Sequence, residues 1–139
     1  MNPPVITAIL AAVLIIMQQV LLLQIGAYRR KSRIGVGFAE DPNLERMIRR
    51  HGNLAENGGL FLIVLALAEL LQTPMSMVIA FAGVFFVARL LHAISFSSLG
   101  GSHGHTGSRK FLILRSLGAI GTALSGIVLG AYLLFYLLV

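Results

Sequence analysis

Four apolar runs dominate the chain, and each is close to the ~20 residues that a helix needs to cross the hydrocarbon of a bilayer. Prolines stand before the first run, at the start of the second and before the third, where a helix tolerates them (Pro3, Pro4, Pro42 and Pro74). The pattern predicts helices at about 5–28, 43–71, 75–96 and 110–139. We therefore expect an all-α membrane protein with a single domain, a four-transmembrane-helix bundle that covers residues 1–139.

Composition agrees with this fold class. Hydrophobic residues make up 57% of the 139 residues and charged residues only 12%, whereas soluble domains carry roughly 25% charged residues. A chain of this size must build any chemistry from its helices and short loops. The absence of cysteine excludes disulfides, a cysteine nucleophile and thiolate metal sites. The formal charge of +6 is placed beside spanning helices, where it sets topology and contacts anionic lipid, so we expect no nucleic-acid partner.

Basic residues are concentrated at two of the three predicted loops. The first loop and its flanks carry Arg29, Arg30, Lys31, Arg33, Arg46, Arg49 and Arg50, and the third carries Arg109 and Lys110. The second loop and both termini carry none. The positive-inside rule therefore predicts that loops one and three are cytoplasmic and that both termini lie on the other side.

Charged and polar side chains also lie within the predicted spans. Those that concern us are Arg46, Arg49, Asn53, Glu56, Arg89, His92 and Arg115. Helical spacing places the four from the second helix on one face, within about 80° of one another. An ionisable residue at membrane depth indicates a functional site by default. The alternative at this point is a set of buried ion pairs that only hold the helices together.

Depth indicates which charges can meet. Glu56 and Arg89 are both about 21–24 Å from the surface where the second helix turns into the third, at about 1.5 Å per residue. They can therefore pair across these helices, whereas Glu69 lies near the surface where the second helix turns into the third and is expected to be interfacial. In this half of the bundle three arginines face one glutamate, Glu56; they are Arg49, Arg89 and Arg115. This excess of positive charge favours an anionic ligand with carboxylates. Glu56 could serve an ammonium group of that ligand.

These residues resemble a known signature. Glu45-Arg46-x-x-Arg49-x-His51-x-Asn53-x-x-Glu56-Asn57, followed by Leu60-Phe61, resembles that of membrane-associated proteins in eicosanoid and glutathione metabolism, the MAPEG family. Val87-Ala88-Arg89-Leu90-Leu91-His92 and Arg115-Ser116 resemble the motifs of its third and fourth helices. The resemblance covers nearly the whole chain, and bacterial-type members are especially similar.

The resemblance implies a homotrimer in a bacterial inner membrane, with glutathione bound between subunits near the cytoplasmic face. It implies that glutathione contacts Arg30 (or its neighbour Arg29), Arg49, Asn53, Glu56, Asn57, Arg89, His92 and Ser116. Arg115, from the neighbouring subunit, is the implied catalytic residue, because its guanidinium would stabilise the glutathione thiolate. The second substrate would be a lipophilic electrophile or a lipid, and the activity that of a glutathione transferase or peroxidase.

Three departures from the family pattern keep a second function open. Some members carry tyrosines where this chain has Asn57, Phe96 and Ala119. The loss of these hydroxyl donors makes a non-catalytic lipid- or glutathione-binding protein the alternative. A small four-helix exporter is a third hypothesis, but such proteins usually need an acidic residue in the first span, and this span has none.

Two further patterns have simpler interpretations. His103-Gly104-His105 offers two histidines in a loop without a third ligand nearby, so no metal site is expected. Thr122, Gly126 and Gly130 recur at four-residue spacing in the last helix, which favours close helix packing within or between subunits.

Overall fold

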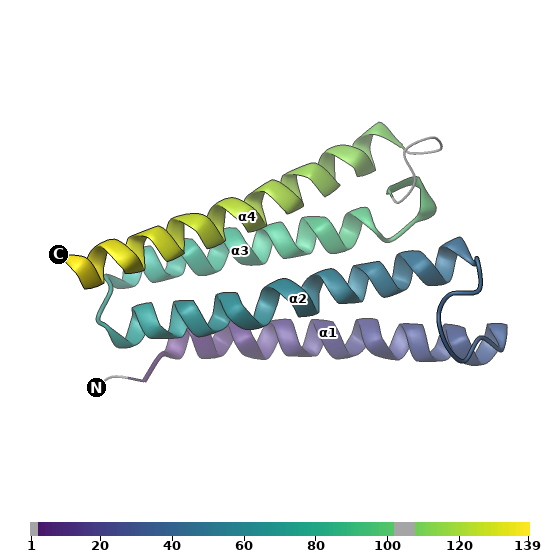
Figure 1. The fold of residues 1–139 in the computed structure, drawn as a ribbon, viewed down its shortest axis with the longest axis horizontal. Helices are drawn as coiled ribbons and strands as arrows, with labels where there is room; N and C mark the ends of the chain where they lie inside the picture. Colours follow the sequence, from purple (N-terminus) through teal and green to yellow (C-terminus); the bar gives the residue numbers. More distant parts are fainter. Residues whose placement is uncertain (1–2, 102–107) are drawn as a thin grey trace.

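The computed structural model describes residues 3–101 and 108–139. Its elements are α1 (Val5–Ser32), α2 (Pro42–Leu70), α3 (Met75–Ser95), the short 3₁₀ helix η1 (Leu99–Gly101) and α4 (Arg109–Leu138). The four long helices run side by side in alternating directions (Figure 1). The α1–α2 and α3–α4 connections therefore lie at one end, which we call the basic end, and the α2–α3 turn lies at the other. The predicted all-α, four-helix fold is confirmed, and the described residues contain no strand.

All four helices are long and apolar enough to cross a membrane. Many of their large apolar side chains are exposed on the surface of the single chain, among them Ile16, Leu23, Ile127 and Phe135. In water such a surface would be unfavourable, but lipid or a second protein chain can cover it.

The first helix extends beyond its predicted end near residue 28 and continues through the basic cluster to Ser32. Arginine and lysine are good helix formers, and positive charge in the last turn interacts favourably with the helix dipole. The helix ends where Arg33 adopts a left-handed backbone conformation (φ 58°), with its N–H donating to the Arg29 carbonyl. The basic turn is thus part of α1 and not of the loop.

The start of α2 is fixed by Asp41. Its carboxylate accepts hydrogen bonds from the N–H groups of Asn43 (2.8 Å) and Leu44 (3.2 Å) and from the Tyr28 hydroxyl on α1 (2.9 Å). Partial desolvation raises the pKa of this carboxyl, but the hydrogen bonds from Leu44, Tyr28 and Asn43 outweigh it and lower the pKa below its usual range. Asp41 therefore caps α2 and joins it to α1.

Glu69 joins the same two helices at the opposite end. The start of α1 has no capping side chain of its own, because Pro4 stands at that position. Instead, Glu69 of α2 accepts from the N–H groups of Ile6 (3.0 Å) and Thr7 (2.9 Å) and from the Thr7 hydroxyl (2.7 Å). The prediction that Glu69 lies away from the other charges is confirmed, but its role is to cap a helix.

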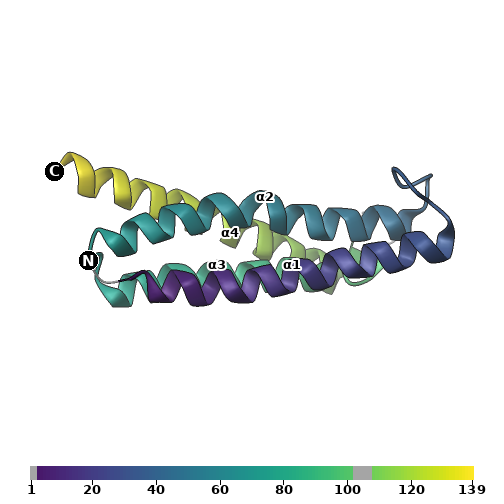
Figure 2. The same cartoon turned by 90° about the horizontal axis from the view of Figure 1, so that it is seen from below.

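The helices pack mainly as two hairpins, α1 with α2 and α3 with α4, and α4 runs obliquely across α3 (Figure 2). The stacked rings of Phe61 and Phe85 join α2 to α3, with centroids 3.7 Å apart. The helices α3 and α4 approach each other closely at Gly118. A Cβ on Gly118 would lie 2.7 Å from the backbone nitrogen of His92 and 2.8 Å from the carbonyl oxygen of Ala88. Only glycine allows this approach.

Candidate functional site

Arg89 is the central charged residue of the bundle. It is only 3% exposed, on α3. Its Nη1 donates to the Asn53 carbonyl of α2 (2.9 Å), and its Nη2 donates more weakly to the Gly118 carbonyl of α4 (3.4 Å). One guanidinium therefore connects three helices. Its buried Nε has no hydrogen-bond partner among the described residues, which leaves the group with unused donor capacity.

One helical turn further along α3, a row of rings leads to Arg115. The imidazole of His92 stacks on the Phe96 ring, with centroids 4.9 Å apart. The Arg115 guanidinium lies over the same Phe96 ring, 4.9 Å from its centroid, in cation–π geometry. Phe96 thus occupies the place between a buried histidine and an exposed arginine, and the backbone approach at Gly118 brings α4 close enough to α3 for this contact.

The structure brings Asn53, Arg89, His92 and Arg115 into one connected set. Asn57 joins it, since its Nδ2 donates to the Asn53 carbonyl (2.9 Å) that also accepts from Arg89. The Nδ2 of Asn53 donates in turn to the Arg49 carbonyl (3.0 Å). Within the described residues no donor reaches the side-chain oxygen of either asparagine, so both can accept a hydrogen bond.

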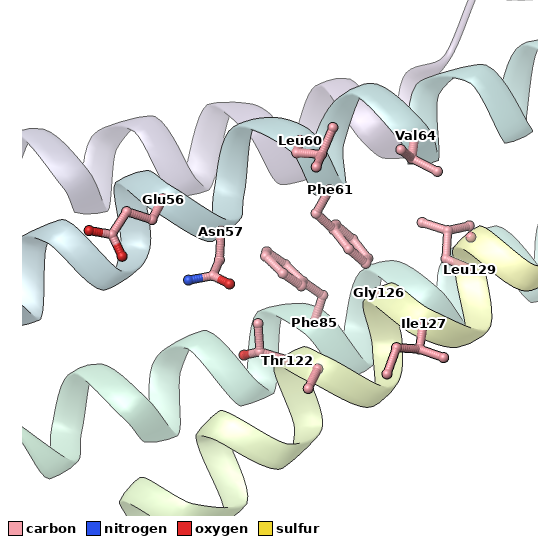
Figure 3. A pocket seen from close by; sticks show the side chains of 12 residues that line it. Glu56, Asn57, Leu60, Phe61, Val64, Phe85, Thr122, Gly126, Ile127 and Leu129 are labelled. Carbon is pink, nitrogen blue, oxygen red and sulfur yellow. The ribbon is translucent and has the colours of Figure 1, made fainter.

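A groove between α2 and α4 begins beside this set. Its volume is ≈ 450 Å³. Glu56 and Asn57 lie at one end of the groove, Phe61 and Phe85 line its middle, and Gly126 lies on the α4 side (Figure 3). The groove is therefore polar at one end and apolar along the rest, as an amphiphilic ligand requires.

The predicted ion pair between Glu56 and Arg89 is wrong within a single chain. Arg89 donates to backbone carbonyls instead. The Glu56 side chain is exposed, and its Oε1 comes within 3.6 Å of the position that a Cβ on Gly52 would take. Equal depth in the membrane does not ensure contact, because the Glu56 side chain is exposed whereas the Arg89 guanidinium is buried against backbone carbonyls. Glu56 therefore keeps an exposed carboxylate.

Three predicted ligand contacts lie at the surface of the single chain. Arg30 is exposed in the last turn of α1, Arg49 is exposed on α2, and Ser116 is exposed on α4 beside Arg115. The structure does not bring Arg30 or Ser116 into hydrogen-bond contact with the other described residues of the set. A site that used them together would have to combine surfaces of more than one chain.

Two arginines, Arg46 and Arg50, were not among the predicted glutathione contacts. The Arg46 Nη1 donates to the carbonyl of Phe96 at the end of α3 (2.6 Å). The Nε atoms of Arg46 and Arg50 are buried without a hydrogen-bond partner among the described residues. Their four-residue spacing on one helix could have indicated a shared face. The pair His103 and His105, considered above for metal binding, lies outside the described residues.

The three tyrosines of the chain make their contacts elsewhere. Tyr28 donates to Asp41 in the loop after α1. Tyr136, near the far end of α4, donates to the Leu71 carbonyl (3.0 Å), and Tyr132 packs against Phe81. The departures noted at Asn57, Phe96 and Ala119 are therefore not offset by a tyrosine from another part of the chain.

The fold and this site define a class: an integral membrane protein of four helices with a cationic, partly buried set of side chains at one end. The model of the MAPEG family matches residues 7–135, and the chain belongs to this family. It is thus a membrane protein of eicosanoid and glutathione metabolism in the broad sense that membership implies. Neither a curated protein nor a solved structure matches the chain significantly.

Proposed function

We propose that this protein is a glutathione-binding membrane protein that acts as a glutathione transferase or peroxidase on lipophilic electrophiles. The observation that carries the proposal is the excess of guanidinium at the basic end. Arg89 is buried with an orphaned Nε, and Arg49 and Arg115 are exposed beside it, while Glu56 is the carboxylate of the set. Glutathione has two carboxylates and one ammonium group, which this donor and acceptor set fits.

The residues divide into binding and positioning groups. Arg49 and Arg30 would bind carboxylates, Glu56 would accept from the ammonium, and the amide groups of Asn53 and Asn57 would bind the peptide bonds. Arg89 holds the Asn53 carbonyl and α4 in register and thereby positions the binding residues. His92 and Ser116 complete the proposed contact surface.

Arg115 is the proposed catalytic residue. A guanidinium next to the thiol favours the thiolate and so lowers the thiol pKa. The thiolate would attack the electrophilic carbon of a second substrate, forming a carbon–sulfur bond as the leaving group departs with its electron pair. The apolar part of the α2–α4 groove supports a lipophilic substrate.

Assembly and orientation complete the proposal. Exposure of Arg30 and Ser116 on the single chain supports a site between subunits, and we infer a homotrimer from family membership. The charge distribution supports a cytoplasmic basic end, with both termini on the other side. Cytoplasmic glutathione would then reach the site from water and the second substrate from the bilayer.

A second candidate function has its own supporting observation. Phe96 presents a ring and no hydroxyl between His92 and Arg115. A site without a tyrosine donor could bind glutathione or lipid without turning it over, as a non-catalytic binding protein.

Turnover separates the two functions. The purified protein in detergent should bind glutathione in calorimetry and should conjugate it to a chloronitrobenzene, releasing chloride. Binding without conjugation or peroxide reduction would favour the non-catalytic alternative. Absence of binding would overturn both glutathione proposals.

A further inference from the structure

Arg46 and Arg50 form a cationic pair that the proposed glutathione site does not use. They lie four residues apart on α2, about 40° from each other around the helix. Arg49 lies about 100° from Arg50 and about 60° from Arg46 around the helix. Both members of the pair are half-buried, with buried Nε atoms that have no hydrogen-bond partner in the described part of the chain.

The pair is short of compensating charge. Like charges four residues apart on a helix destabilise it. Arg46 has one partner, the neutral carbonyl of Phe96, and Arg50 makes no hydrogen bond or ion pair with the described residues. The carboxylate of Asp41, at the start of the same helix, accepts from Tyr28, Asn43 and Leu44. An anion from outside the chain would therefore relieve the repulsion by accepting hydrogen bonds from the Arg50 guanidinium.

Helix length places the pair at the level of the lipid headgroups. A hydrocarbon layer of about 30 Å corresponds to about 20 helical residues. Counted back from the end of α2 at Leu70, that layer ends close to residue 51. The 21 residues of α3 independently bring its end to the same level, and the Arg46–Phe96 hydrogen bond confirms that the two levels coincide. Arg46 and Arg50 thus lie where phospholipid phosphates lie.

We propose that Arg46 and Arg50 form a phosphate-binding site, separate from the glutathione site, at the basic end of α2. The guanidinium of Arg50 supplies the free donors, and Arg46, fixed by the Phe96 carbonyl, supplies a second, pre-positioned charge. A phosphate is available there from two sources, the headgroup of an anionic phospholipid and free phosphate in the adjoining water. This site does not depend on the proposed function.

Retention of lipid in native mass spectrometry tests the site. Wild-type protein is mixed in detergent with phosphatidylglycerol or phosphatidylcholine and compared with Arg50→Gln. We expect phosphatidylglycerol to be retained in preference to phosphatidylcholine, and Arg50→Gln to weaken its retention about tenfold, as for loss of a charge-assisted hydrogen bond. Arg50 is chosen because replacing Arg46 would also release the end of α3.

The matched control is Arg109→Gln, which removes the same charge from an exposed position at the start of α4. It should leave phosphatidylglycerol retention unchanged. A parallel titration with inorganic phosphate reports the other source, since a rise in the thermal midpoint of wild type that is absent from Arg50→Gln would support a site for free phosphate. The proposal would be overturned if Arg50→Gln and Arg109→Gln lost phosphatidylglycerol equally. It would also be overturned if wild type neither retained phosphatidylglycerol preferentially nor gained thermal stability from inorganic phosphate. Glutathione binding, measured alongside, should be the same in wild type and Arg50→Gln.

Discussion

Arg89 holds three helices together through hydrogen bonds to backbone carbonyls. Its guanidinium bonds to carbonyls of α2 and α4, so a buried charge is stabilised by peptide dipoles in the absence of a carboxylate. This arrangement leaves Glu56 exposed and free to bind a ligand.

Glu56→Gln should therefore weaken glutathione binding without lowering the stability of the fold. We expect glutathione affinity to fall about tenfold, as for loss of a charge-assisted hydrogen bond. The free energy of unfolding should change by no more than about 0.5 kcal/mol, as for other exposed substitutions. Calorimetry and thermal denaturation measure the two effects, with Glu45→Gln as a control. A large loss of stability in Glu56→Gln alone would indicate that Glu56 does neutralise Arg89.

Arg115→Ala should impair thiol activation more than binding. Arg115 is exposed and lies over Phe96, so its removal leaves the buried part of the set in place. We expect the glutathione affinity of the variant to stay within several-fold of the wild-type value, while the pKa of the bound thiol rises. Each tenfold loss of thiolate corresponds to about 1.4 kcal/mol. Thiolate absorbance against pH measures this, and Arg109→Ala is the control. An unchanged thiol pKa would rule out the role of Arg115.

At the scale of helices, the apolar runs predicted all four long helices and most of their ends. Length and polarity fix a spanning helix, because an unpaired backbone is too costly in hydrocarbon. What could not be predicted was which groups of neighbouring helices come into contact. Which carbonyl Arg89 would reach depends on the close approach of α3 and α4 at Gly118, and which group would cap α1 depends on the distant Glu69. Periodicity and depth do not specify such contacts.

Gly118→Ala should loosen the α3–α4 hairpin. The added Cβ would lie less than 3 Å from backbone atoms of His92 and Ala88, so the helices must separate. Overpacking of this kind costs about 1–3 kcal/mol, and we expect the thermal midpoint and glutathione affinity to fall together. Gly83→Ala is the control, because a Cβ there would meet no atom within 4 Å. Equal stability of the two variants would contradict the close approach.

The Asp41 cap should make the stability of α2 depend on pH. Because hydrogen bonds lower its pKa in the folded protein, the carboxylate contributes stability above the pKa of the unfolded chain, about 3.9. That contribution is lost as the pH falls through that value towards the lower folded pKa. Asp41→Asn keeps a capping oxygen but cannot titrate, so its thermal midpoint should fall less than that of wild type between about pH 5 and pH 3. Parallel curves for the two proteins would show that Asp41 does not titrate with a lowered pKa.

At the scale of the whole molecule, the single chain presents its proposed ligand contacts on several faces, and assembly would unite them. We expect a homotrimer in native mass spectrometry of the detergent-solubilised protein, with up to three glutathione molecules bound per trimer. The small residues of α4 agree with packing both within one chain and between chains. Gly118 packs within the chain, whereas a Cβ on Gly126 or Gly130 would meet no atom of the same chain within 4 Å. A mass spectrum that contained monomers or dimers but no trimer would exclude a trimeric site.

The bond between Glu69 and the start of α1 has a consequence for how the protein is made. The ribosome synthesises α1 before α2. The carboxylate that caps the first N–H groups of α1 therefore follows them by more than sixty residues in the chain. The cap cannot exist until α2 has been synthesised through Glu69 and its far end has reached the same membrane surface. The first helix thus completes its own hydrogen bonding only as one half of an inserted pair.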